Sequence, residues 1–428
     1  MINGIELGPY LDQPGHREAE ARDAVDPLAG HLERFRIGDP ELVYLDGNSL
    51  GRLPNATPDR VDEVVHGEWG DRLIRSWNES WWDLADRIGD KIAPLIGAAD
   101  GEVIVSESTT TNLHKLAGAA LELRPDRGTV VTDDLNFPSD VHVLAGVAAR
   151  AGRRLVVVES DGVEGPVDSL LAAIDDDTAL VSLSLTAFKS GYTYDLAAVT
   201  AAAHDAGALV LWDLSHAVGA IEVDLGGAHA DLAVGCTYKF LNGGPGSPAF
   251  LFVRGDLIDQ LANPITGWWG DAAPFDFGLD HVPAGGIRRF QVGTAPILSL
   301  AAMEPGIDLV AEAGMEAVAA KGRELVAVAA DRWAARLSPL GFEWATPQDP
   351  ARRGAHAALA HPDAWRITQA LIEVGRVVPD FRAPDNVRLG LSPLTTSFVD
   401  LHTAIERLAR IVEAGVHERY SEARSAVT

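Results

Sequence analysis

The sequence predicts an α/β protein whose large domain is built on a mainly parallel sheet, followed by a small α+β domain. Short apolar runs alternate with helical segments over roughly residues 90–255, a pattern typical of a parallel sheet covered on both faces. A long helical stretch follows at 303–337, and the remaining residues mix strand and helix patterns. This order predicts two domains of unequal size.

The bulk composition limits the classes of function. The chain has 428 residues, of which 47% are hydrophobic and 23% charged, as in ordinary globular proteins of about two domains. A net charge of −27 argues against nucleic acid or an anionic membrane as a partner. Cys236 is the single cysteine, which excludes an internal disulfide and suits a reducing cytoplasm. No signal peptide or membrane-spanning run is expected, so we predict a cytoplasmic protein.

The first hundred residues carry little chemistry of their own. Residues 1–45 combine polar turns with one expected helix, and a turn-rich segment follows at 44–54, where Asn48 and Ser49 could reach a substrate. Residues 58–95 have a helical pattern that contains a cluster of tryptophans: Trp69, Trp77, Trp81 and Trp82. Such clustering predicts a core or a subunit interface more often than ligand stacking.

A strand–loop–helix unit comes next. The expected strand is 103–105, the loop is the hydroxyl-rich segment 106–111, and the helix is 112–123. Hydroxyl side chains at a helix start can cap the helix. They can also help free backbone N–H groups to bind a phosphate. Both interpretations stay open at this point.

The alternation then continues. A strand at 129–132 leads to a second helix start, 136–140, where Phe137 could lie flat on an aromatic cofactor, although a capping turn has the same sequence pattern. The further strands expected are 155–158, 179–185 and 248–253, with a helix at 195–206.

Two segments give the strongest chemical signal. ALVLWDLSHAVG (208–219) is typical of a buried strand that presents Asp213 at its carboxyl end. DLAVGCTYKFLNGGPG (231–246) contains a second buried strand, followed by Tyr238 and Lys239 and by a turn rich in glycine and proline. Lys239 is one of only five lysines in a chain that uses arginine for most of its positive charge. A lysine among apolar and aromatic neighbours therefore indicates a specific role more than a solvated surface.

Together these residues predict a pyridoxal phosphate (PLP) site. Parallel sheets bind ligands at the carboxyl ends of their strands. A lysine there can hold the PLP aldehyde as a Schiff base, because burial favours its neutral amine, and an aspartate can keep the pyridine nitrogen protonated. Taken singly, Lys239 could be a partly exposed lysine at a strand end, and Asp213 a cap or turn residue.

The last part of the chain predicts the small domain. Candidate strands are 342–345, 355–360 and 387–391, and candidate helices are 363–374 and 398–414. Arg388 lies on the third strand, where its guanidinium could clamp a substrate carboxylate; a surface arginine is the alternative. The sequence shows no metal-ligand spacing, and we expect no metal.

With these segments assembled, the chain resembles the kynureninase family, which are fold-type I PLP enzymes of the aminotransferase class V group. The resemblance covers residues 44–394. The motifs that carry it are YLDGNSLG (44–51), TTTNLH (109–114), FPSD (137–140), WDLSHAVG (212–219), GCTYKFLNGGPG (235–246), GWWG (267–270), GTAPI (293–297) and RLGLSPL (388–394).

The resemblance implies a fold and an activity. The fold would have an N-terminal segment (1–60) that contributes to the small domain and the active site, a large PLP-binding domain (61–305) with a seven-stranded sheet, and a connecting helix with the small domain (306–428). The activity would be hydrolytic cleavage of L-kynurenine, or its 3-hydroxy derivative, to anthranilate, or 3-hydroxyanthranilate, and L-alanine in tryptophan catabolism. A homodimer with shared active sites is implied as well.

The resemblance also implies roles for individual residues. Lys239 would be the Schiff-base lysine, Asp213 the partner of the pyridine nitrogen, and Tyr238 a proton donor. Asn48 and Arg388 would hold the substrate carboxylate. The remaining cofactor contacts implied are Thr109, Thr110, Phe137, Ser139, Asp140, Ser184 and His216, with Trp268 and Thr294 from the second subunit.

Three positions depart from the family pattern. Leu185 to Phe188 stand where many relatives read His-Val-x-Tyr, Asp271 where many have histidine, and Thr395 where many have tyrosine. They would lie nearer the substrate's side chain, so they bear on the substrate more than on the cofactor. Another PLP-dependent lyase, desulfurase or aminotransferase therefore stays an alternative, as does a catalytically silent PLP-binding homologue. A desulfurase would need a mobile nucleophilic cysteine, for which Cys236 is the single candidate.

Overall fold

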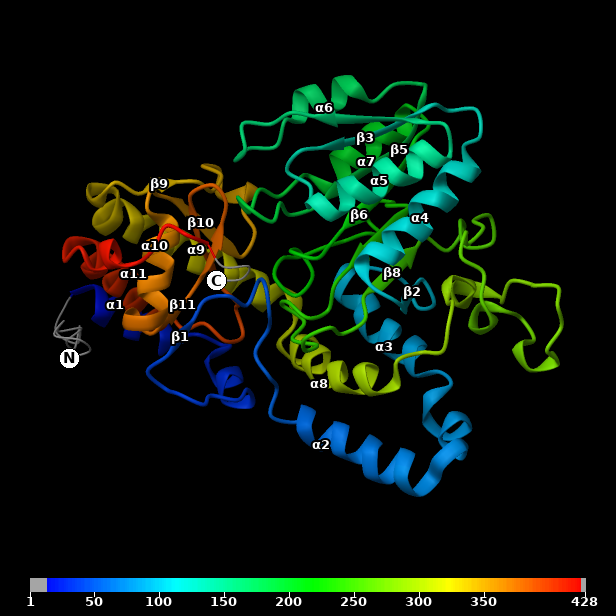
Figure 1. Ribbon diagram of the computed structural model, residues 1–428, viewed down its shortest axis with the longest axis horizontal. Coiled ribbons are helices and arrows are strands. Elements are labelled where there is room, and N and C mark those ends of the chain that lie inside the picture. Colours follow the sequence, from blue (N-terminus) through cyan, green and yellow to red (C-terminus); the bar gives the residue numbers. More distant parts are fainter. Residues whose placement is uncertain (1–13, 425–428) are drawn as a thin grey trace.

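The computed structural model describes residues 14–424 and shows two lobes, each with a hydrophobic core (Figure 1). The larger core lies mainly in the α/β part of the chain. The smaller core joins side chains from 19–45 to side chains from 325–416. The N-terminal segment packs against both lobes, because Ala19, Val43 and Leu45 lie in the smaller core and Leu28 and Phe35 lie in the larger one. The chain then continues along the large lobe at α2 (Thr57–Asp62) (Figure 1).

The large lobe is built on a seven-stranded sheet in the order β2-β8-β7-β6-β5-β3-β4. Six strands are parallel to one another, and β8 alone runs antiparallel to its two neighbours. The predicted mainly parallel sheet is confirmed. The strands are β2 (Val103–Val105), β3 (Thr129–Asp133), β4 (Arg154–Val158), β5 (Thr178–Ser184), β6 (Leu209–Asp213), β7 (Leu232–Gly235) and β8 (Phe250–Val253).

Helices pack around this sheet (Figure 1). They are α3 (Leu84–Ile92), α4 (Thr109–Leu123), α5 (Pro138–Arg150), α6 (Val167–Ala173) and α7 (Leu196–Asp205). Every residue of β5, β6 and β7 is buried, and most of these residues are apolar, as expected for strands covered on both faces. The sheet is thus a rigid base for the loops at its carboxyl edge.

Three expected helices have different limits in the structure. Helix α4 begins at Thr109 rather than at Asn112, because Ser108 caps it by accepting the backbone N–H of Thr111. The stretch 303–337 is two helices, α8 (Ile297–Ala313) and α9 (Met315–Arg332), separated at Gly314 with a left-handed φ of 78°. The stretch 58–95 is also broken, at Leu73 with a φ of 55°.

The small lobe contains a four-stranded antiparallel sheet in the order β12-β13-β10-β9. Its strands are β9 (Glu343–Trp344), β10 (His356–Ala360), β12 (Asp380–Arg382) and β13 (Asn386–Gly390). Its helices are α1 (Pro14–Asp23), α10 (Ala364–Ala370) and α11 (Phe398–Glu413). A two-stranded parallel sheet pairs β1 (Val43–Tyr44) with β11 (Val377–Val378). The sequence did not predict β1, β11 or β12, which have only two or three residues each.

The tryptophan cluster is largely core. The Trp77 ring lies edge-on to both Trp81 and Trp269, with centroids 5.3 Å apart in each pair, whereas Trp69 is 57% exposed. Within residues 14–424, no helix has the length and apolar character needed to cross a bilayer.

Candidate active site

A cavity of about 220 Å³ lies at the carboxyl ends of β6 and β7, where the two lobes meet. The N-terminal segment, the starts of α4 and α5, and strands β12 and β13 also contribute to it. The residues that line it are Asn48, Ser49, Thr109, Thr110, Phe137, Ser139, Asp140, Phe188, Asp213, Ser215, His216, Tyr238, Lys239, Arg382 and Arg388. The fold thus brings most of the predicted site residues into one cavity.

The lysine lies beside an uncharged histidine. Lys239 follows the end of β7, and its Nζ is 2.8 Å from Nε2 of His216, in the turn after β6. Burial and the nearby lysine hold the pKa of His216 well below its usual range, so the imidazole is neutral. The same Nζ is 5.9 Å from the centroid of the Phe137 ring. The Lys239 amine therefore lies between the neutral imidazole of His216 and the ring of Phe137.

Two carboxyl groups face one another in the cavity. Asp213, the last residue of β6, accepts the backbone N–H of Ser215 at 2.9 Å and its hydroxyl at 2.6 Å, both on Oδ1. Asp213 thus does serve as a turn residue, but with one oxygen only. Burial, together with the adjacent Asp213, raises the pKa of Asp140 well above its usual range. Two carboxyls this close favour a cation or a shared proton between them.

These groups fit PLP by the chemistry of the donors that are present. Oδ2 of Asp140 is buried and finds no hydrogen-bond partner among the described residues, and a protonated ring nitrogen would supply the missing positive charge near the carboxyl pair. Lys239 offers an amine for the aldehyde, and Phe137, 43% exposed on the cavity wall, offers a ring to stack on. A flat cationic ring with an aldehyde matches this arrangement.

A hydroxyl-lined helix start lies at the edge of the same cavity. Thr109 and Thr110 open the 15-residue helix α4, and Thr110 Oγ1 is 3.1 Å from Oγ of Ser139, in the first turn of α5. Ser108 is the cap, so the capping interpretation holds for that residue. The two threonines and Ser139 remain available for a phosphate, which the positive end of a helix dipole favours.

The opposite end of the cavity is formed by the N-terminal segment and the small lobe. Asn48 is fully buried, and neither its Nδ2 nor its Oδ1 has a hydrogen-bond partner within residues 14–424. Arg388, on β13, is 1% exposed, so the alternative of a surface arginine is wrong. An unpaired amide beside a guanidinium suits a carboxylate ligand.

Cys236 and Tyr238 lie between the end of β7 and Lys239. The neighbouring Cys236 and burial together raise the pKa of Tyr238, so its phenol keeps its proton at neutral pH. Cys236 is 2% exposed, and burial raises the pKa of its thiol. A buried thiol of this kind is a poor nucleophile.

Three of the predicted residues do not line this cavity. Ser184 ends β5 and donates its hydroxyl to Oδ1 of Asn136 at 2.6 Å. Trp268 and Thr294 are both exposed and belong to the segment between β8 and α8. Part of this segment projects from the large lobe (Figure 1), while Trp269 and Ala295 lie in the larger core.

The departures from the family pattern fall in different surroundings. Phe188 lines the cavity, and its ring meets that of Phe137 edge-on with centroids 5.2 Å apart. Leu185 and Thr395 are buried. Asp271 accepts the backbone N–H groups of Ala273 and Val282, so it closes a turn.

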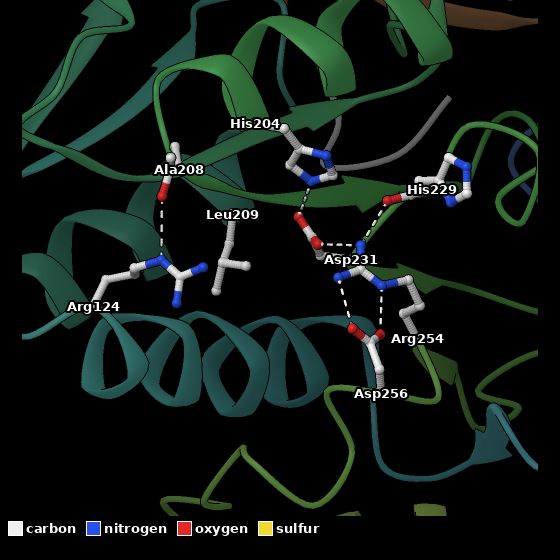
Figure 2. Close-up of a pocket in the computed structure, with 9 residues that line it drawn as sticks. Arg124, His204, Ala208, Leu209, His229, Asp231, Arg254 and Asp256 are labelled. Atoms are coloured by element: carbon white, nitrogen blue, oxygen red, sulfur yellow. Dashed lines mark hydrogen bonds and ion pairs between the residues drawn. The ribbon is translucent and has the colours of Figure 1, made fainter.

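A larger cavity, about 610 Å³, lies at the opposite edge of the sheet. Figure 2 shows His204 and Arg254 pointing toward Asp231, and Arg254 also toward Asp256. The two aspartates are thus already paired with Arg254, and the site is at the amino ends of β6 and β7, where parallel sheets seldom bind ligands. The smaller cavity is the candidate active site.

Two lining residues, Ser215 and Arg382, were not among the predicted site residues. Ser215 lies in the turn after β6 and donates to Asp213. Arg382, on β12, follows an aspartate that pairs with Arg388. Because β12 has only three residues, no periodic pattern marks it as a strand, and its facing toward the cavity had no signal in the sequence. No group of three or more histidine, cysteine or acidic side chains within residues 14–424 is arranged to hold a metal ion.

Two family models and several curated relatives match most of this chain. The aminotransferase class-V model matches residues 43–356, and the kynureninase C-terminal domain model matches residues 318–408. The kynureninase of Pseudomonas fluorescens is 41% identical over 401 residues, which cover 92% of this chain and 94% of that protein. The kynureninase of Burkholderia pseudomallei (strain 1106a) is 42% identical, covering 92% of this chain and 95% of that protein.

Solved structures with a similar fold are more distant in sequence. The cysteine desulfurase of Thermococcus onnurineus NA1 has a TM-score of 0.75 and covers 92% of this chain and 98% of its own. The cysteine desulfurase CsdA of Escherichia coli has a TM-score of 0.77, with coverage of 91% and 99%. Each is 18% identical, so they establish the fold alone.

Proposed function

The chain belongs to the kynureninase family, and we propose which of its residues carry out the family's reaction. The protein is a PLP-dependent enzyme of the kynureninase type, which cleaves the side chain of L-kynurenine. The residue assignment rests on the positions of Lys239 and Asp213, which line one cavity. Asp213 ends β6, and Lys239 follows the adjacent strand β7. PLP, when bound, supplies a ring that withdraws electrons from the substrate carbons.

Lys239 attaches the cofactor and then acts as the base at the α-carbon of the substrate. His216 supports this role because its neutral Nε2, 2.8 Å from Nζ, can accept a hydrogen bond from the amine and aim it. Asp213 would hold the ring nitrogen in its protonated form, since Ser215 occupies only Oδ1 of its carboxylate. A preorganised charge of this kind is usually worth more than any other single contribution to the rate.

Tyr238 is the proposed general acid for the carbon that is left after the side chain departs. Its raised pKa means that the phenol carries its proton under all ordinary conditions, and it lies on the same wall of the cavity as Lys239. A phenol beside the site of charge development can donate that proton. Asn48 and Arg388 are the proposed holders of the α-carboxylate.

We also propose a homodimer in the cytoplasm. The support is the exposed apolar surface of the segment between β8 and α8, with Phe275 61%, Phe277 80% and Leu279 102% exposed. Exposed apolar patches of this kind mark interaction sites, and Trp268 and Thr294 lie in the same segment. Light scattering of the purified protein tests the dimer. If Trp268 serves the partner's site, a mixture of Lys239→Ala and Trp268→Ala chains should regain activity in hybrid dimers.

The decisive experiment for function is direct. Purified protein loaded with PLP is mixed with L-kynurenine, and the release of fluorescent anthranilate is followed alongside the absorbance of the bound cofactor. A steady release of anthranilate is expected. Intact PLP absorbance with no turnover of L-kynurenine or of other amino acids would instead support the silent homologue. The buried Cys236 disfavours a desulfurase, despite the similar folds.

A further inference from the structure

Two arginines and one aspartate share one face of the small sheet. Strands β12 and β13 pair antiparallel with Asp380 opposite Arg388, and side chains opposite one another lie on the same face. Arg382 is two residues from Asp380, so it also points to that face. The fold therefore places three charged side chains at the end of the cavity where the substrate carboxylate is expected.

Arg388 is already neutralised. Its Nε donates to Oδ1 of Asp380 at 2.9 Å and its Nη2 to Oδ2, and both side chains are 1% exposed. Nη2 also donates to Ser49 Oγ at 3.0 Å, and Nη1 donates to the carbonyl of Phe188. A guanidinium has five N–H groups, so one is left. A buried, closely matched ion pair has no net charge with which to attract a distant anion.

Arg382 has more free N–H groups than Arg388. Its side chain is 34% exposed, and Nη2 is 2.8 Å from Oδ2 of Asp380 and 3.1 Å from Ser49 Oγ. Nη1 donates to the carbonyl of Phe381 at 3.0 Å. Its Nε–H and one Nη1–H have no acceptor among the described residues. Arg382 also lines the cavity, so a carboxylate that enters can reach it.

The cluster of Asp380, Arg382 and Arg388 carries a surplus of positive charge. One aspartate between two arginines gives a net charge of +1. Asp46 faces the same cluster, but burial and the nearby Asp380 raise its pKa to about 7. Its neutral form, present below that pH, leaves the surplus intact. In a chain with a net charge of −27, such a local positive site is needed to bind an anionic group.

We propose that Arg382 supplies the positive charge that selects substrates with an α-carboxylate, whereas Asp380 and Ser49 hold Arg388 in position. This inference rests on the proposed function, because it assigns a specificity-determining residue to the same site. Arg388 contributes its last free N–H and Asn48 its unpaired amide, and Arg382 contributes the net attraction. Selection against amines without a carboxylate then depends on Arg382.

The test compares two ligands in holoenzyme variants. L-Kynurenine and its decarboxylated amine share a side chain and an amino group, so they differ in the carboxylate alone. Affinities are measured by titrating the absorbance of the bound cofactor, and KM and kcat by anthranilate release. The variants are Arg382→Gln, which removes the charge, and Arg382→Lys, which keeps it. Arg424→Gln is the control, since Arg424 contacts the ring of Phe381 but does not line the cavity.

We expect Arg382→Gln to raise KM for L-kynurenine about tenfold to a hundredfold, the usual size for a lost charge-assisted hydrogen bond, with kcat changed less than about threefold. Its affinity for the decarboxylated amine should stay at the wild-type value, Arg382→Lys should recover part of the loss, and Arg424→Gln should behave as wild type. An unchanged KM in Arg382→Gln, or equal weakening of both ligands, would overturn the inference alone. Failure of the wild-type enzyme to release anthranilate would overturn the proposed function, and the inference with it.

Discussion

Replacing Asp213 by asparagine tests the electrostatic centre of the proposed site. Oδ1 of Asp213 accepts two hydrogen bonds from Ser215, at 2.9 and 2.6 Å. The carbonyl oxygen of asparagine can accept both, so the turn after β6 should keep its shape and PLP should still bind. The amide nitrogen would then stand where the second carboxylate oxygen stood. An N–H group there opposes a proton on the ring nitrogen instead of stabilising it.

The expected loss follows from the nature of this contact. Removing one preorganised charge from a buried site costs roughly 10²–10³ in kcat, about 2.7–4 kcal/mol. We therefore expect Asp213→Asn to bind PLP and to turn over at least about a hundredfold more slowly.

The assay follows anthranilate release at saturating L-kynurenine, and cofactor content is determined from the absorbance of the denatured protein. Ser215→Ala is the matched control, because it removes the 2.6 Å hydroxyl bond and leaves the carboxylate in place, so its effect should be much smaller. If Asp213→Asn, fully loaded with PLP, keeps kcat within about tenfold of wild type, the assignment of Asp213 to the ring nitrogen is wrong.

Three more predictions concern single groups. Lys239→Ala should lose the long-wavelength absorbance of lysine-bound PLP, and a variant that keeps this band would refute the assignment. Because the pKa of Asp46 is raised to about 7, its ionisation at higher pH places a negative charge beside Asp380; KM for L-kynurenine should rise above about pH 7 in the wild type and stay flat in Asp46→Asn. Burial lowers the pKa of Lys115 to about 7, so the unfolded state binds more protons between about pH 7 and 10, and this group's contribution to stability rises with pH. Lys115→Met should flatten the pH dependence of the unfolding temperature over that range; an unchanged slope would contradict the assignment.

The sequence predicted the strands of the large sheet well, because their residues are buried on both faces and form continuous apolar runs between turns. Strand β5, for example, is buried from Thr178 to Ser184, and its predicted limits, 179–185, differ by one residue. The helices were predicted less well at their ends. Helix α4 begins after the Ser108 cap, and the break between α8 and α9 lies at Gly314. Alternative helix ends one or two residues away differ little in free energy, so the sequence does not distinguish them.

Sequence motifs predicted those site residues whose chemistry depends on residue type and on position at the end of a strand. Lys239 and Asp213 stand out because their chemistry requires them at strand ends. Arg382 and Asp380 could not be found, because their meaning depends on the register of two short strands. The partnering of Arg388 with Asp380 is a contact that spacing in the sequence does not reveal. The family resemblance reached further, since it placed Asn48 and Phe137 in the same cavity as the lysine.

The N-terminal segment has a consequence for biosynthesis. Val43 and Tyr44 pair with Val377 and Val378, and the backbone N–H of Gly51 donates to the carbonyl of Tyr238 at 2.7 Å. Val43 and Tyr44 therefore have no strand to pair with until residues 377 and 378 have been made. Domains usually fold as they emerge, from the N-terminus onward. Here the strands of the large sheet, which end at Val253, are made before the partners of Val43 and Tyr44. The substrate end of the cavity combines Asn48 and Ser49 with Arg382 and Arg388, so a chain that stops before residue 382 lacks half of the groups proposed to hold the substrate.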